Sequence, residues 1–106
     1  MNLEIDFSKI NDLESMHNSL KKKFGFPDFY GKNVNALIDC LTSLRYPEDG
    51  MTKVILKKEE VLNLTIYSMP YDNALVINHF FIAIQSVNSR YKITDDVPPI
   101  NLILLD

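Results

Sequence analysis

FPDFYGKNVNALIDCL, residues 26–41, joins an aromatic loop to the start of a helix. The loop, residues 26–32, includes a proline and a glycine, which have special backbone preferences, and we expect it to be ordered. Asn33 is a good N-cap, because its side chain can accept a hydrogen bond from a free backbone N–H group at a helix start. A helix is therefore predicted over residues 34–44, where Asp39 is the lone acid. The sequence thus places one carboxylate on a rigid support.

The predicted helix has an apolar side and a polar side when its residues are wound at about 100° per residue. The apolar side should pack into the core and consists of Val34, Leu37, Cys40, Leu41 and Leu44. The opposite side carries three polar residues at positions i, i+4 and i+7 and one apolar residue at its border: Asn35, Asp39, Thr42 and Ile38. These four residues are candidates for a contact patch.

A strand and another helix are predicted before this stretch. Residues 3–7, LEIDF, alternate apolar and acidic side chains, which is the pattern of a strand with one buried face. Asn11 and Glu14 have the spacing of a capping box, so a helix should begin there. Its apolar positions recur three or four residues apart until Gly25 ends the helix: Leu13, Met16, Leu20 and Phe24.

The residues after position 44 are harder to interpret. Residues 54–56, VIL, follow an acidic turn and suit a buried central strand. Residues 57–71 allow either a short helix or a strand, the latter because apolar residues alternate at positions 62, 64 and 66. Both alternatives stay open.

A long helix and a last strand complete the predicted elements. The helix is capped by Asp72 or Asn73, runs to about Ser89 and is apolar on nearly every side, so it should be largely covered. Residues 100–105, INLILL, are typical of a strand inside a parallel sheet with both faces buried.

The order of these elements predicts an α/β fold in a single domain, residues 1–106. Strands that alternate with helices imply right-handed crossovers and a small three-stranded parallel sheet, flanked by about three to four helices. A length of 106 residues with 46% hydrophobic residues fits one modest core.

Composition and charge exclude several classes of protein. The net charge of −3, from 11 basic and 14 acidic residues, lacks the basic excess of nucleic-acid-binding proteins. No apolar run approaches the roughly 20 residues that span a bilayer, and the N-terminus has no secretory signal. Cys40 is the one cysteine and cannot form an internal disulfide, as is usual in a reducing compartment. We expect a soluble, cytoplasmic protein without a membrane or nucleic-acid partner.

Catalytic constellations are missing from the sequence. His17 and His79 have no nearby nucleophile and no metal-ligand spacing, so a structural or exposed role is favoured for each. Neighbouring acids occur in loops, where acids are usually only solvated, and there is no glycine-rich phosphate loop. The chain is therefore predicted not to be an enzyme and to need no cofactor or metal.

Residues 20–42, LKKKFGFPDFYGKNVNALIDCLT, resemble the barstar family, whose members inhibit ribonucleases inside the producing cell. The positions that match are Pro27, Tyr30-Gly31, Asn33, Ala36-Leu37 and Asp39-Cys40-Leu41-Thr42. A weaker similarity of segment order extends over the whole chain. The resemblance implies three parallel strands flanked by helices, in agreement with the order of elements. It also implies that residues 27–44, the loop and helix, block the active site of a ribonuclease toxin, in a complex of 1:1 stoichiometry.

The resemblance also implies roles for individual residues. Asp39 would imitate an RNA phosphate, because a ribonuclease must hold phosphate with cationic side chains. Phe29 and Tyr30 would supply stacking area, and Gly31 would let the backbone approach the partner. The remaining members of the implied partner-binding site are Asn33, Asn35, Ile38, Thr42 and Ser43.

Three departures from the family pattern leave a second hypothesis open. Asn35 stands where barstar has a second aspartate, Ile38 stands where it has an exposed tryptophan, and residues 74–89 contain no acid that could replace the contact from the later helix. The target could therefore be a non-ribonuclease toxin or a regulatory partner that a barstar-like module binds. An unrecognised small hydrolase is the last alternative.

Overall fold

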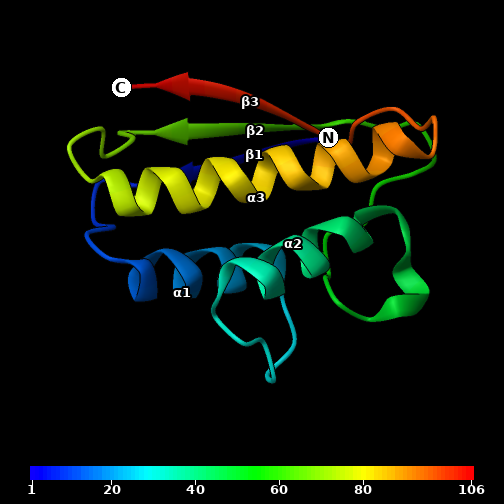
Figure 1. Ribbon diagram of the computed structural model, residues 1–106, viewed down its shortest axis with the longest axis horizontal. Coiled ribbons are helices and arrows are strands. Elements are labelled where there is room, and N and C mark those ends of the chain that lie inside the picture. Colours follow the sequence, from blue (N-terminus) through cyan, green and yellow to red (C-terminus); the bar gives the residue numbers. More distant parts are fainter.

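A three-stranded parallel sheet forms one layer of the protein (Figure 1). The computed structural model describes residues 1–106, with strands β1 (Asn2–Asp6), β2 (Leu62–Tyr67) and β3 (Ile100–Leu105). The strand order is β1-β2-β3, and both pairs are parallel. The predicted α/β fold with a small parallel sheet is confirmed.

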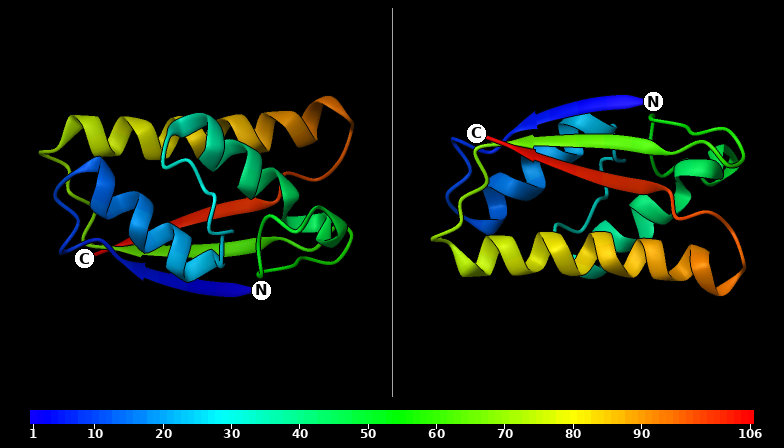
Figure 2. Two further views of the ribbon diagram at one scale, coloured as in Figure 1. Left: turned by 90° about the horizontal axis from the view of Figure 1, so that it is seen from below. Right: turned by 90° about the horizontal axis from the view of Figure 1, so that it is seen from above.

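Three α-helices cover one side of this sheet (Figure 1). They are α1 (Leu13–Phe24), α2 (Val34–Thr42) and α3 (Ala74–Ile93), and two single-turn 3-10 helices follow α2 at Ser43–Arg45 and Pro47–Asp49. The view from above in Figure 2 shows the opposite face of the sheet with no helix over it. None of the helices combines the length and hydropathy that crossing a membrane requires.

The core lies between the sheet and the helices. In β2, alternate side chains are buried because successive residues of a strand point to opposite faces. Full burial of an aliphatic or aromatic side chain of this kind contributes about 1.5–3 kcal/mol. The innermost members come from α1, α2, β2 and α3 and from the residue that follows β1. They include Phe7, Met16, Leu20, Phe24, Leu37, Leu41, Leu62, Leu64, Ile66, Val76, Phe80 and Val87.

The open face of the sheet carries an asparagine ladder. Asn2, Asn63 and Asn101 stand side by side in the strand register. The Asn63 amide donates to Asn2 Oδ1 at 3.1 Å, and the Asn101 amide donates to Asn63 Oδ1 at 3.1 Å. Further along the same face of β3, Ile103 and Leu105 are exposed. This face is therefore polar at one end and partly apolar at the other.

The first helix begins one residue later than the sequence predicted. Asp12 is the N-cap of α1, and its carboxylate accepts from the Ser15 N–H at 2.7 Å, while the Ser15 hydroxyl accepts from the Asp12 N–H at 3.3 Å. The expected capping box of Asn11 and Glu14 is therefore wrong. Hydrogen bonds to the Asp12 carboxylate from the Ser15 backbone and side chain lower the pKa of Asp12, and an anion at a helix N-terminus is favourable. Gly25 ends the helix in the left-handed conformation, as predicted.

The predicted strand over residues 54–56 does not form. Its neighbour Lys53 donates its N–H to the Phe24 carbonyl at 2.9 Å, and Leu56 donates to the Leu44 carbonyl at 2.7 Å. These residues therefore bind the free carbonyl groups at helix ends instead of joining the sheet. The central strand is β2, within the segment that the sequence left open.

The last helix and the last strand are more exposed than expected. β3 is an edge strand with Leu104 and Leu105 exposed, so the prediction that both of its faces are buried is wrong. α3 extends past Ser89 to Ile93, and Leu75 and Ile82 on it are also exposed. Both differences have one cause, because the helices form a single layer and leave the far side of each element in solvent.

Candidate protein-binding surface

The start of α2 is fixed by its predicted N-cap. Asn33 has an extended backbone, and its side-chain oxygen accepts from the Ala36 N–H at 2.8 Å. The Asn33 amide also donates to the Gly31 carbonyl at 3.4 Å. A Cβ atom at Gly31 would lie 3.2 Å from the Asn33 amide nitrogen, so glycine leaves room for this cap. Between them, Lys32 adopts a positive φ of 51°.

Tyr30 anchors the loop that precedes α2. Its side chain is only 6% exposed, and its hydroxyl lies 2.6 Å from His17 Nδ1 of α1 in a buried hydrogen bond. The Tyr30 ring also packs on Phe26, with ring centroids 4.8 Å apart. Burial raises the pKa of Tyr30 far above its usual range, and burial followed by repulsion from His79 and Lys32 lowers the pKa of His17. Both side chains are therefore neutral near pH 7.

Phe29 has the opposite environment from Tyr30. It is 77% exposed, which is unusual for a large apolar side chain. Pro27 accepts a backbone hydrogen bond from the Tyr30 N–H at 2.9 Å, so the loop turns tightly around Phe29. The loop thus holds one aromatic ring in the core and presents the next one to solvent.

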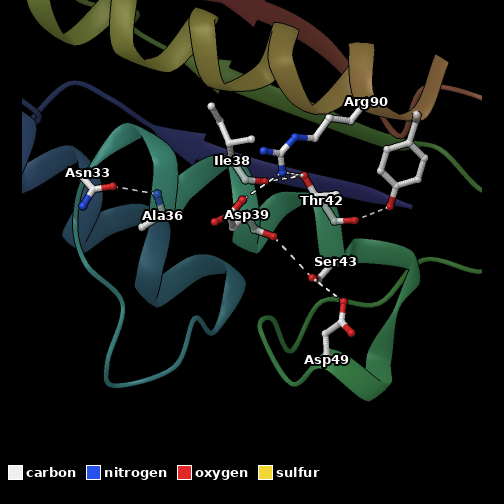
Figure 3. A network of polar contacts seen from close by, with 9 residues as sticks. Asn33, Ala36, Ile38, Asp39, Thr42, Ser43, Asp49 and Arg90 are labelled. Carbon is white, nitrogen blue, oxygen red and sulfur yellow. Dashed lines mark hydrogen bonds and ion pairs between the residues drawn. The ribbon is translucent and has the colours of Figure 1, made fainter. Parts of the chain in front are cut away.

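Asp39 occupies the middle of the exposed side of α2, as predicted, and it is paired with Arg90 of α3 (Figure 3). Arg90 Nη1 lies 3.0 Å from Asp39 Oδ1 and also donates to Thr42 Oγ1 at 3.2 Å. The side chains of Arg90 and Asp39 are 50% and 61% exposed. A pair so open to water adds little to stability, typically about 0–1 kcal/mol.

The C-terminal end of α2 is held by two further contacts (Figure 3). The Tyr91 hydroxyl donates to the Thr42 carbonyl at 2.6 Å and so satisfies a free carbonyl at the helix end. Ser43 donates its hydroxyl to Asp49 Oδ2 at 2.9 Å, which joins α2 to the second 3-10 helix. Both ends of α2 are therefore fixed by named hydrogen bonds.

The nine predicted contact residues divide into an outer and an inner group. Those open to solvent are Phe29, Gly31, Asn33, Asn35 and Asp39, with Thr42 half-buried. Those in the interior are Tyr30, Ile38 and Ser43. Ile38, expected at the border between the two sides of the helix, is 8% exposed and belongs to the core cluster. The outer group is polar apart from Phe29 and Gly31, and the inner group is buried.

The contacts of three residues in this region escaped the sequence analysis. Arg90 was missed because the predicted helix stopped at Ser89, and its contact with α2 spans 51 residues. Asp49 belongs to the neighbouring acids Glu48 and Asp49, which were expected to be only solvated, and the role expected for His17 did not name Tyr30 as its partner. No local signal in the sequence links any of them to α2.

The surface is not a cleft. Two cavities of about 280 Å³ and 380 Å³ occur on the protein, and none of the nine predicted contact residues lines either of them. No group of three histidine, cysteine or acidic side chains comes together as metal ligands. An exposed helix that carries the Asp39–Arg90 pair and lies outside both cavities is suited to contact the surface of a partner.

Comparison with known proteins agrees with the resemblance in the loop and α2. Residues 1–66 match the family described as "Barstar (barnase inhibitor)", a family of inhibitors and not of enzymes. This match spans the chain from β1 to β2 and ends before α3.

A curated relative supports the same assignment over a longer part of the chain. The protein named "Putative ribonuclease inhibitor YrdF" from Bacillus subtilis (strain 168) is 35% identical over 89 residues. The aligned region covers 84% of this chain and 91% of the relative. The chain therefore belongs to the barstar family.

Proposed function

We propose that this chain is a cytoplasmic inhibitor that blocks the active site of a ribonuclease toxin in a 1:1 complex. The surface that would enter the site consists of the loop from Pro27 to Lys32 and the exposed side of α2. Membership of the barstar family and the name of the Bacillus subtilis relative support this proposal.

The observation that carries the proposal is the position of the Asp39 carboxylate. It is 61% exposed at the centre of a helix whose two ends are fixed, so its place relative to a partner is well defined. A ribonuclease holds the RNA phosphate with cationic side chains, and a carboxylate can pair with the same cations. Charge-assisted pairs of this kind are among the stronger polar contacts.

The outer group of predicted contact residues would form only part of the contact surface around Asp39. A stable interface uses roughly 20–30 residues on each side, so the surface must extend beyond the outer group of predicted contact residues. Phe29 supplies an exposed aromatic ring on one flank, and the second 3-10 helix lies on the other. Aromatic residues are enriched at the energetic centres of interfaces.

The decisive experiment compares wild type with Asp39→Ala on a captured partner. The chain is expected to co-purify with a ribonuclease from the producing cell and to abolish its RNA cleavage at equimolar concentration. Asp39→Ala should inhibit at least about 100-fold less well, because the partner's cations are left buried and unpaired. Glu14→Ala, which removes an exposed acid from α1, is the matched control and should inhibit like wild type. RNA cleavage by the partner that is the same with or without this chain would refute the proposal.

A second function is favoured by two observations. Asp39 is already paired with Arg90, and Asn35 leaves α2 with a single acid, so the surface is less anionic than the resemblance implied. These features suit a barstar-like module that binds a non-ribonuclease toxin or a regulatory protein. This alternative would be selected if the captured partner does not cleave RNA and if Asp39→Ala no longer binds it.

A further inference from the structure

Arg90 lies in the last turn of α3 and reaches across to α2 (Figure 3). It uses Nη1 for both of its hydrogen bonds, to Asp39 Oδ1 at 3.0 Å and to Thr42 Oγ1 at 3.2 Å. We call Asp39, Thr42 and Arg90 the two-signed patch. The family match to residues 1–66 does not reach Arg90, so this patch combines a family position with one outside the matched region.

Both charged members of the two-signed patch keep hydrogen-bonding capacity for a partner. A guanidinium has five N–H donors, and Nη2 and Nε of Arg90 have no hydrogen bond within the protein. Asp39 Oδ2 likewise accepts none. Since each side chain is at least half exposed, a partner can offer a cation to Asp39 and an acid to Arg90 without breaking the internal pair.

The electrostatic character of the surface follows from the surrounding charges. α2 carries Asp39 as its single charge, and α3 contains no acid but carries Arg90 and Lys92 in its last turn. An opposite pair 3.0 Å apart acts on distant charges as a dipole, and exposed charges are screened beyond about 8 Å at physiological salt. The surface therefore differs from a uniformly acidic one in the charges that it presents to a bound partner and in its attraction of a distant one.

We propose that Arg90 is a specificity-determining contact. The two-signed patch fits a ribonuclease site in which the cation that meets Asp39 stands beside an acidic side chain that meets Arg90. It rejects a site that is basic throughout, because the second cation would face Arg90 at close range. The inference rests on the proposed function and adds the charge pattern of the partner.

Barnase is a suitable probe, because the family is named for its inhibitor and the enzyme must bind RNA phosphate. We would titrate barnase with wild type, Arg90→Glu and Lys92→Glu and measure RNA cleavage. Lys92→Glu makes the same change of charge on the same turn, and the Lys92 side chain has no hydrogen bond or ion pair in the structure. Arg90→Glu is expected to inhibit at least about tenfold more strongly than wild type, whereas Lys92→Glu should stay within about threefold of it.

A double variant tests whether the stronger inhibition by Arg90→Glu depends on Asp39. Asp39→Ala combined with Arg90→Glu should lose most of the gain, because the carboxylate that enters the basic site is missing. Thermal unfolding followed by circular dichroism checks that each variant is folded. If Arg90→Glu does not fold, Arg90→Gln removes the charge and keeps most of the length of the side chain, and a gain of the same sign is expected.

Several outcomes would overturn the inference. The first is equal inhibition of barnase by Arg90→Glu and Lys92→Glu. The second is a gain in inhibition that survives the loss of Asp39. The third is inhibition of barnase that is the same for wild type and all variants, including no inhibition by any of them. The captured ribonuclease separates these outcomes from the proposed function. If wild type inhibits that enzyme through Asp39 but Arg90→Glu gains nothing on barnase, the inference about Arg90 falls and the proposed function stands.

Discussion

The exposed side of α2 and the open face of the sheet are both uncovered, but they are built differently. On α2, Arg90 of α3 contacts the Asp39 carboxylate, and the C-terminal end of the helix is held by Tyr91 of α3 and Asp49 of the second 3-10 helix. On the sheet, the asparagine ladder links strands that backbone hydrogen bonds already join. The comparison teaches that exposure does not mark a binding surface by itself. We propose that an exposed charge on a helix held by several other elements is the better indication.

The largest expected effect is a loss of affinity for the partner after a change on α2 but not after a change on the sheet. Asp39→Ala should raise the Kd for the captured partner by at least about 100-fold, while the melting temperature changes little because the Arg90 pair is exposed. Ile103→Thr, on the open face of the sheet, should leave the Kd unchanged. Calorimetric titration measures both. A similar loss of affinity for the two variants would remove the distinction between the surfaces.

The next effect concerns the support under the α2 surface. Tyr30→Phe removes the hydroxyl that bonds His17 at 2.6 Å and leaves a buried nitrogen without its partner. We expect the free energy of unfolding to fall by about 1–3 kcal/mol. Denaturant unfolding gives this value. Tyr67→Phe, on the open face of the sheet, has a long contact of 3.4 Å to Glu4 and is the matched control. Equal losses for both variants would show that the Tyr30 hydroxyl has no special role.

The burial of His17 should also give stability a pH dependence. Burial lowers the pKa of His17 below 6.5, so the unfolded chain binds more protons than the folded chain at mildly acidic pH. The stabilisation from neutral His17 is fully present above pH 6.5 and is lost as the pH falls through that value towards the folded pKa. Asp6, Asp12 and Glu60, whose pKa values are also lowered, act in a more acidic range.

His17→Gln provides the check on this assignment. Free energies of unfolding measured between pH 5 and 8 should rise with pH for wild type and should be flatter for the variant in that window. Parallel curves for the two proteins would assign the pH dependence to another group.

The smallest expected effect is on the open face of the sheet. Asn63→Ala removes two side-chain hydrogen bonds of 3.1 Å that are accessible to water. We expect a loss below about 1 kcal/mol, because such bonds replace equivalent bonds to water. Denaturant unfolding and the same titration measure the change. A larger loss, or an altered affinity, would give the ladder more importance than the comparison assigns to it.

The features that the sequence predicted well depend on neighbours within one or two turns. The Asn33 cap, the Gly25 stop and the buried side of α2 all follow from side chains no more than a few residues apart. Local hydrogen bonds and helical periodicity determine such features whatever the rest of the chain does.

The features that the sequence could not predict depend on distant partners. Residues 54–56 are as apolar as a central strand, yet this segment donates its backbone N–H groups to the carbonyl groups of Phe24 and Leu44 and does not join the sheet. Tyr30 was expected at the surface, but His17 of α1 offers it a buried partner. The pairing of Asp39 with Arg90 likewise requires knowledge of how α2 packs on α3. The contact roles of the nine residues stay predictions until a complex is measured.

The fixation of both ends of α2 has a consequence for the speed of recognition. The Asn33 side chain accepts from a backbone N–H group in the first turn of α2, and the Tyr91 hydroxyl donates to a carbonyl group in its last turn. The helix therefore has little conformational entropy left to lose on association. A partner that meets this helix needs only the right orientation, with no folding step to wait for. Under the proposed function, a shorter delay would reduce the amount of RNA that the partner cleaves before it is inhibited.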